Sequence, residues 1–287
     1  MEIYSFFFHS MPCFGKGFLV YCFLKSWSIF RERSLPQKRY NQIMIRFICV
    51  VTFVILFLIC SIPLLIAEWI IGQFNMELKN RSSLAIIRWA FGVCLWIAGV
   101  KVTILGEDNV PTDSPVLFVA NHRSYFDILL TYVRMKRPCG FVAKKEMSGI
   151  PLLSSWMKNI HCLFLDRKDI KKGMQTILEG IEKLKSGISL FIFPEGTRNK
   201  TADAFLPFHA GSFKLAEKSG SPVIPIAINN AGDIFEDHFP KIRKTHVVME
   251  FGKPVYTADM DRELKKNLPK LCFEQIQIMY EKNKSLV

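Results

Sequence analysis

The chain has 287 residues, half of them apolar, and a formal net charge of +13. This length allows one large domain or two small ones, and the positive charge favours an anionic partner. No nucleic-acid-binding module, zinc-finger spacing or basic-region heptad occurs in the sequence, so a membrane surface is the expected partner rather than nucleic acid. The eight cysteines include no CxxC pair, so we expect them to be reduced, in the cytoplasm, and to hold no structural zinc.

The first part of the chain is more apolar than the rest. Residues 47–67 carry no charge and are long enough to cross a hydrocarbon core as a helix, with Pro63 as a potential kink. A buried core helix is the alternative. Residues 84–100 form a second, shorter apolar segment that contains Arg88. Because cations precede the first segment and follow the second, we expect residues 44–100 to form a membrane-associated helical hairpin, spanning or dipping into one leaflet, with both flanks in the cytoplasm.

Met44 directly precedes this apolar region. A methionine followed by an arginine and an apolar run is how a short membrane-anchored protein normally begins. We therefore interpret residues 1–43 as an N-terminal extension that is dispensable for the fold.

From residue 101 onward, short apolar runs alternate with helix-like stretches. The runs predict strands at 101–105, 115–120, 140–144, 162–166, 188–193, 222–228 and 246–252. Helices are predicted near 124–135, 149–159, 169–186, 210–219 and 257–283, the last with a break at Pro269. This alternation predicts an α/β domain over residues 101–287, with a sheet flanked by helices.

The motif NHRSYFD places a histidine directly after the apolar run 115–120. His122 is therefore expected at the carboxyl end of a strand, where α/β folds place their sites. The residues after it resemble a helix start, which would bring Asp127 close to the imidazole. A carboxylate there can accept a hydrogen bond from Nδ1–H and leave Nε2 to take a proton from a substrate hydroxyl. The alternative is a capped helix start with a structural histidine.

A second motif, FPEGTR, ends the predicted strand at 188–193. Gly196 permits close backbone approach, and its amide could face an anion or a developing oxyanion. Arg198 offers a planar fork for phosphate. Glu195 could bind a substrate hydroxyl or anchor the loop. The alternative for the whole motif is a solvent-exposed turn with a salt bridge.

Cations follow two further strands. The run CLFLDR ends in Asp166 and Arg167, and FVAKKE supplies Lys144 and Lys145. Together with Arg198, they predict a phosphate site at the ends of three strands, because a purely structural sheet has no reason to gather cations at its termini.

The run VIPIAI follows, and Pro225 inside it indicates an edge strand, a bulge or a pocket wall. In this order, NHRSYFD, CLFLDR, FPEGTR and VIPIAI resemble the four motifs of the glycerolipid acyltransferase family, in particular its bacterial 1-acyl-sn-glycerol-3-phosphate acyltransferase type, over roughly residues 100–255. The resemblance implies a glycerolipid acyltransferase-like mixed sheet. It also implies transfer of a fatty acyl group from acyl-CoA or acyl carrier protein to the sn-2 hydroxyl of lysophosphatidate, giving phosphatidate for phospholipid synthesis. We expect this at the cell membrane, with the catalytic domain facing the cytoplasm and with no metal or organic cofactor.

The resemblance also assigns roles. His122 would be the general base and Asp127 its orienting partner. The residues that would bind the phosphate and glycerol are Arg167, Glu195, Gly196, Thr197 and Arg198, joined by Lys144 and Lys145. Many members of the family have glycine five residues before the aspartate of the second motif, where this chain has His161. That side chain is expected to be structural and partly buried, and to add bulk near the acceptor.

Three other interpretations are open. The same chemistry could serve another acceptor, such as glycerol 3-phosphate, another lysophospholipid or an amino-lipid. A non-catalytic membrane protein that binds anionic lipids would explain the charge and the hairpin, but not His122 with Asp127. A hydrolase that uses the same histidine on water is disfavoured, because the sequence has no Ser or Cys nucleophile elbow.

Overall fold

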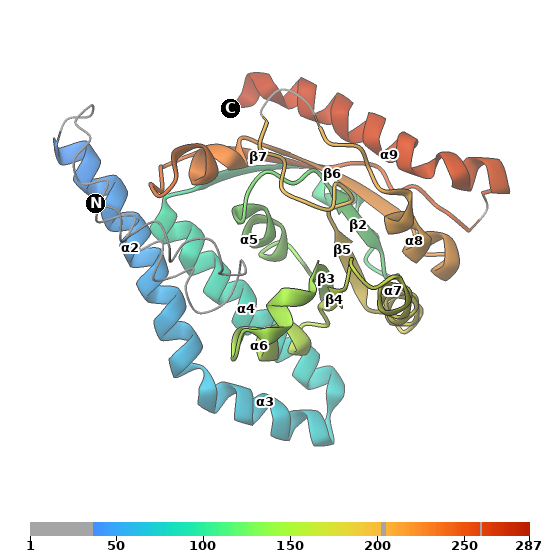
Figure 1. The fold of residues 1–287 in the computed structure, drawn as a ribbon, viewed down its shortest axis with the longest axis horizontal. Coiled ribbons are helices and arrows are strands. Elements are labelled where there is room, and N and C mark those ends of the chain that lie inside the picture. The colour runs from blue at the N-terminus through green and yellow to red at the C-terminus, as the bar shows by residue number, and fades with distance from the viewer. Residues whose placement is uncertain (1–36, 202–204, 259) are drawn as a thin grey trace, which may run out of the picture.

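The chain is described by a computed structural model, which covers residues 37–201, 205–258 and 260–287 (Figure 1). A seven-stranded sheet lies between two layers of helices, and a helical unit precedes it in the chain. Residues 1–36 of the predicted extension lie outside the described residues. The first described helix begins at Gln37, so the boundary expected at Met44 falls inside a helix.

Three consecutive helices form the N-terminal unit: α2 (Gln37–Cys60), α3 (Ile62–Phe74) and α4 (Met76–Ala98). The helix predicted over 47–67 is divided between α2 and α3, which meet at Ser61 with a bend of 48° next to the kink expected at Pro63. Pro63 lies in the first turn of α3. Proline cannot donate a helical hydrogen bond, and its ring clashes with the carbonyl four residues earlier, so the first helix ends just before it.

The segment between the two predicted apolar helices is also helical. Asn75 alone separates α3 from α4, and its side-chain oxygen accepts a hydrogen bond from the Leu78 amide at 2.9 Å, which caps α4. α4 packs against both α2 and α3. By length and apolar composition, α4 could cross a membrane, and α2 with α3 would give a second span only if the bent pair is counted as one.

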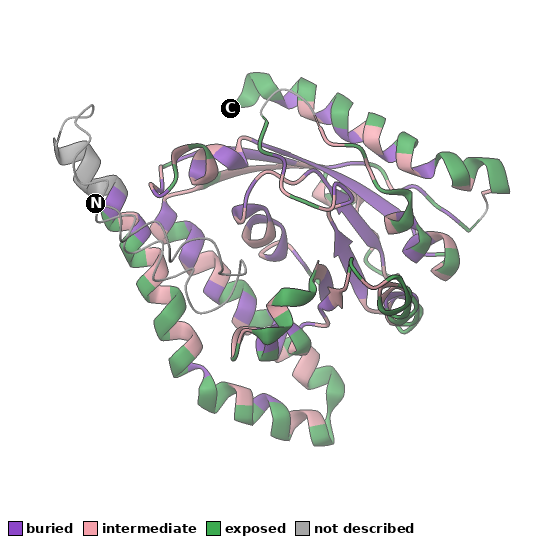
Figure 2. Cartoon of the chain, in the orientation of Figure 1, coloured by how far each residue is buried: buried purple, intermediate pink, exposed green. Residues whose placement is uncertain are grey.

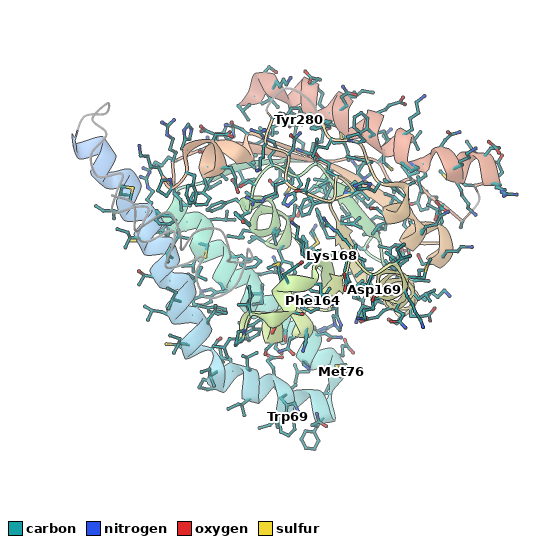
Figure 3. All side chains as sticks on the ribbon, viewed as in Figure 1. Trp69, Met76, Phe164, Lys168, Asp169 and Tyr280 are labelled. Atoms are coloured by element: carbon teal, nitrogen blue, oxygen red, sulfur yellow. The ribbon has the colours of Figure 1, made fainter. Side chains whose placement is uncertain are left out.

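Large apolar side chains of this unit face outward. Trp69, Phe74 and Trp96 are 64%, 87% and 81% exposed, and the exposed positions follow α2 and α3 in Figure 2. Trp69 and Met76 lie at the end of the unit farthest from the sheet (Figure 3). A continuous apolar surface of this kind fits the predicted contact with a membrane.

Seven strands form the sheet. They are β1 (Lys101–Leu105), β2 (Leu117–Ala120), β3 (Cys139–Lys144), β4 (Leu163–Leu165), β5 (Ser189–Ile192), β6 (Val223–Asn229) and β7 (His246–Phe251), in the spatial order β1-β7-β6-β2-β5-β3-β4. Strands β2 to β6 are mutually parallel, whereas β7 runs antiparallel to β6 and parallel to β1. The predicted α/β mixed sheet is confirmed, and the carboxyl ends of β2 to β6 share one edge.

Helices cover both faces of this sheet. α5 (Phe126–Tyr132) and α6 (Leu153–Asn159) lie with α2 and α4 on one face, and α7 (Ile170–Lys185), α8 (Lys214–Ser219) and α9 (Arg262–Asn283) lie on the other (Figure 1). Side chains alternate between the faces along each strand. In β2, Phe118 therefore joins the core under α5, whereas Leu117 and Val119 join the core under α7 to α9. Leu84 and Ile87 of α4 belong to the first core, which ties the N-terminal unit to the sheet.

Pro269 and Pro225 were expected to interrupt a helix and a strand, and the structure differs from these expectations in part. α9 runs through Pro269 without the predicted break. Its buried face packs on the sheet, and that tertiary packing outweighs the lost helical hydrogen bond. Pro225 lies in β6, an interior strand, so the edge interpretation is wrong. A bulge does lie opposite Pro225: Val223 pairs with Val255 while Ile226 pairs with Phe251, which leaves one extra residue in the segment after β7 and none in β6.

Candidate active site

His122 and Asp127 form the centre of the candidate site, at the carboxyl end of β2. The loop after the strand carries His122, and Asp127 lies in the first turn of α5, with its Oδ2 at 2.8 Å from Nδ1 of the imidazole. The same oxygen accepts hydrogen bonds from the amides of Arg123 and Ser124, each at 2.8 Å. Asp127 is only 1% exposed. The carboxylate is therefore a fixed acceptor that keeps the proton on Nδ1 and leaves Nε2 as a base.

The imidazole is also held from its face. The ring of Phe193 stacks on that of His122, with the centroids 4.0 Å apart and an interplanar angle of 14°. Phe193 in turn packs on Phe191 of β5, with ring centroids 5.0 Å apart. The stack and the Asp127 hydrogen bond together fix the plane and the rotation of the imidazole. Sequence reasoning missed Phe193, because an aromatic residue at the end of an apolar run resembles ordinary core.

Glu195 anchors the loop that carries His122. Its Oε1 accepts a hydrogen bond from the His122 amide at 2.7 Å, and its Oε2 accepts one from the Leu206 amide at 3.1 Å. In addition, the carbonyl of His122 accepts a hydrogen bond from the Asn199 amide at 2.7 Å. Glu195 is 3% exposed, and burial raises the pKa of its carboxyl group. Both oxygens are engaged by backbone, which favours the loop-anchor interpretation over contact with a substrate.

Gly196 forms the tight turn of the FPEGTR motif. Its φ of +69° is in the left-handed region that favours glycine. Its amide donates a hydrogen bond to the Phe193 carbonyl at 3.0 Å, so the expectation that this amide faces an oxyanion is wrong. A Cβ here would lie 3.0 Å from Cδ2 of His209. The turn and the close approach therefore explain the glycine, and Thr197 follows it at the surface.

Two of the predicted cations meet at this turn. Arg167, which follows β4, donates a hydrogen bond from Nη1 to the carbonyl of Gly196. Arg198, which follows the turn, lies over the ring of Tyr125 with its guanidinium carbon 3.5 Å from the ring centroid. Because Tyr125 lies between His122 and Asp127 in the chain, its contact brings Arg198 to the loop of these two residues, whereas Arg167 is fixed at the Gly196 turn.

The two lysines are placed differently. Nζ of Lys145 lies 2.7 Å from Oδ2 of Asp166, and this hydrogen bond lowers the pKa of Asp166 to about 2. Oδ1 of Asp166 also accepts hydrogen bonds from the amides of Lys168 and Asp169, which shape the turn before α7. Figure 3 labels Lys168 and Asp169. Lys145 is therefore paired with a carboxylate from the loop after the neighbouring strand β4. Lys144 is exposed at the end of β3, next to the last residue of β4.

His161 lies away from this site. It precedes β4, at the opposite end of that strand from Arg167, and its Nε2 is 2.9 Å from Oδ1 of Asn80 in α4. Its φ of +60° is left-handed, which explains why glycine suits this position. The expectation that His161 adds bulk near the acceptor is wrong, whereas its interpretation as a partly buried structural residue agrees with the Asn80 contact.

Comparison with known proteins agrees with the motif resemblance. Residues 101–229 match a family described as Acyltransferase. A 1-acyl-sn-glycerol-3-phosphate acyltransferase of Saccharomyces cerevisiae is 27% identical over 201 residues, which cover 68% of this chain and 65% of that protein. One of Borreliella burgdorferi is 30% identical over 155 residues, 54% of this chain and 62% of that protein. The chain thus spans less than two thirds of the length of the curated relatives that it matches.

A solved structure has the same fold. The crystal structure of the 1-acyl-sn-glycerophosphate (LPA) acyltransferase, PlsC, from Thermotoga maritima superposes with a TM-score of 0.73, covering 86% of this chain and 99% of that chain at 22% identity. The family match and these relatives confirm the resemblance inferred from the four motifs.

Proposed function

We propose that this chain, whose residues 101–229 match the acyltransferase family, transfers a fatty acyl group from acyl-CoA or acyl carrier protein to the sn-2 hydroxyl of lysophosphatidate, giving phosphatidate. The observation that carries the proposal is an imidazole fixed by Asp127 at 2.8 Å, at the same edge of the sheet as two arginines. Arg198 lies on Tyr125 of the loop that carries His122, and Arg167 is bonded to the Gly196 turn. A base next to planar cations suits an acceptor that carries both a hydroxyl and a phosphate. The names of the relatives support the same acceptor.

In this mechanism the hydroxyl oxygen attacks the thioester carbonyl carbon while Nε2 of His122 takes the hydroxyl proton. Asp127 stabilises the imidazolium that forms. The tetrahedral intermediate collapses, the C–S bond breaks, and the imidazolium returns the proton to the sulfur, so the products are an ester and a free thiol. General-base catalysis of this kind contributes about 10²- to 10⁴-fold in rate.

The proposal needs no metal and no organic cofactor, since a thioester is already an activated acyl group. Within the described part of the chain, no cluster of three or more His, Cys, Asp or Glu side chains is arranged to hold a metal ion. The arginines are assigned to the phosphate, with Thr197 and the exposed Lys144 near the same edge of the sheet as further contacts.

The substrate is a membrane lipid, and the outward apolar surface of α2 to α4 would keep the site at the bilayer. We assign the domain to the cytoplasmic side of the cell membrane, because cations precede the first apolar segment.

The test is a panel of acceptors offered to purified protein with acyl-CoA or acyl carrier protein, with products identified by mass. The panel contains lysophosphatidate, glycerol 3-phosphate, another lysophospholipid and an amino-lipid. We expect phosphatidate from lysophosphatidate, and no product from a folded His122→Ala variant. Product from another acceptor alone would replace the assigned substrate, and near-normal turnover by His122→Ala would refute the mechanism.

A further inference from the structure

Glu236 connects the two halves of the candidate site, although it belongs to no motif. It lies in the short 3-10 helix η6 (Glu236–His238), 111 residues after Tyr125. Its Oε1 accepts a hydrogen bond from the Tyr125 amide at 2.7 Å and one from Nη1 of Arg198 at 3.2 Å. A single carboxylate oxygen therefore contacts both the loop of His122 and the cation assigned to the phosphate.

This carboxylate is largely removed from water. The side chain of Glu236 is 17% exposed and that of Arg198 is 31% exposed. Burial raises the pKa of Glu236, and hydrogen bonds from the Ser124 side chain and the Tyr125 amide oppose that rise. A buried carboxylate costs stability unless it is hydrogen-bonded, so packing alone does not explain a glutamate here.

Arg198 is held on two sides as a result. The ring of Tyr125 lies against its planar face at 3.5 Å, and Oε1 of Glu236 contacts its edge. A guanidinium held in this way loses little side-chain freedom when a phosphate binds, which is how a fixed cation increases affinity.

The 3-10 helix is itself fixed in place. Phe235, which precedes it, stacks on Phe47 of α2 with ring centroids 5.7 Å apart, and Asp237 pairs with Arg123 at 3.0 Å. Glu236 thus projects from a segment that is anchored both to the N-terminal unit and to the loop of the dyad.

We infer that Glu236 is a positioning residue that fixes Arg198 against the loop of His122. The site then binds an acceptor that carries a phosphate more tightly than it would with an unrestrained arginine. The inference rests on the proposed function. Glu236 acts through Arg198 and the Tyr125 amide, without touching the acceptor.

The experiment compares Glu236→Ala, Arg198→Ala and the double variant with the wild type, using lysophosphatidate and, as an acceptor without phosphate, a monoacylglycerol. Glu250→Ala is the matched control, since Glu250 is 15% exposed and pairs with Lys282 at 2.6 Å outside the site. We expect Glu236→Ala to raise KM for lysophosphatidate about tenfold, which corresponds to about 1.4 kcal/mol, with kcat within about threefold. The double variant should have the KM of Arg198→Ala alone. Glu236→Ala should change any rate with monoacylglycerol no more than Glu250→Ala does.

The outcomes separate the two proposals. A wild-type protein that does not acylate lysophosphatidate refutes the proposed function. If the wild type acylates lysophosphatidate but Glu236→Ala has an unchanged KM, the role of Glu236 is overturned. The role is also overturned if the effects of the two substitutions on KM add up in the double variant. Circular dichroism and thermal unfolding report whether Glu236→Ala folds. If Glu236→Ala does not fold, Glu236→Gln is measured instead, because glutamine keeps an acceptor for the Tyr125 amide and removes the charge. A KM for lysophosphatidate raised about threefold in Glu236→Gln supports the inference, and a KM equal to that of the wild type overturns it.

Discussion

Asp127→Asn tests whether this carboxylate sets the orientation and tautomer of His122. Oδ2 accepts three hydrogen bonds, each at 2.8 Å, whereas Oδ1 is buried and has no partner among the described residues. An asparagine can keep its oxygen toward the three donors only by burying an amide group without an acceptor, which costs about 1–3 kcal/mol of stability. In the flipped orientation its amide group faces three donors, and the imidazole must change tautomer to keep a hydrogen bond. Either orientation removes the negative charge that stabilises the imidazolium.

We therefore expect kcat to fall by about 10²- to 10⁴-fold, with KM for lysophosphatidate changed by less than about threefold. Initial rates of the purified variant in detergent micelles give both constants, and urea unfolding gives the loss of stability. Asp113→Asn is the control, since Asp113 is exposed and its Oδ1 accepts a hydrogen bond from the hydroxyl of the neighbouring Ser114. A folded Asp127→Asn variant with kcat within tenfold of the wild type would show that the dyad does not act as described.

Three further substitutions test separate parts of the structure. Phe193→Leu removes the ring that stacks on His122 with a centroid distance of 4.0 Å, a contact worth about 1 kcal/mol. We expect initial-rate assays to show a kcat lowered about fivefold. An unchanged kcat would show that the stack does not position the imidazole. Burial lowers the pKa of His161 from 6.5 to about 4. Between these two pKa values the unfolded chain binds more protons than the folded chain. The free energy of unfolding of the wild type should therefore decrease by up to about 3 kcal/mol as the pH falls from about 6.5 to about 4. The free energy of unfolding of His161→Gly should decrease less over the same pH range. If urea unfolding gave the same pH dependence for both proteins, the lowered pKa of His161 would be contradicted. Replacing Trp69 and Phe74, 64% and 87% exposed, by glutamate should abolish flotation with anionic liposomes, and unchanged flotation would place the membrane contact elsewhere.

The strands were predictable because parallel strands buried on both faces are continuous apolar runs. β5 is buried along its length and lies within the predicted run 188–193. β1 also has the predicted bounds, although it is a partly exposed edge strand. The helix breaks were predictable only in part, because the sequence indicated a break at both prolines and only the break at Pro63 occurs. Pro63 and Pro269 have the same local chemistry, but the chain bends two residues before Pro63 and continues as a helix through Pro269. The difference is tertiary: α9 has a sheet to pack on along its length, which a local pattern does not reveal.

The site shows the same division between what the sequence contains and what the fold adds. The sequence indicates that cations follow the strands, because each motif is local. It does not indicate which carboxylate meets each cation, since that depends on strand order and on loops far along the chain. Lys145 meets Asp166 from the neighbouring strand, and Arg198 meets Glu236 from η6. The site is therefore not an open cluster of free positive charge. A phosphate that enters it meets an arginine already oriented by a carboxylate, so its recognition depends on geometry as well as on net charge.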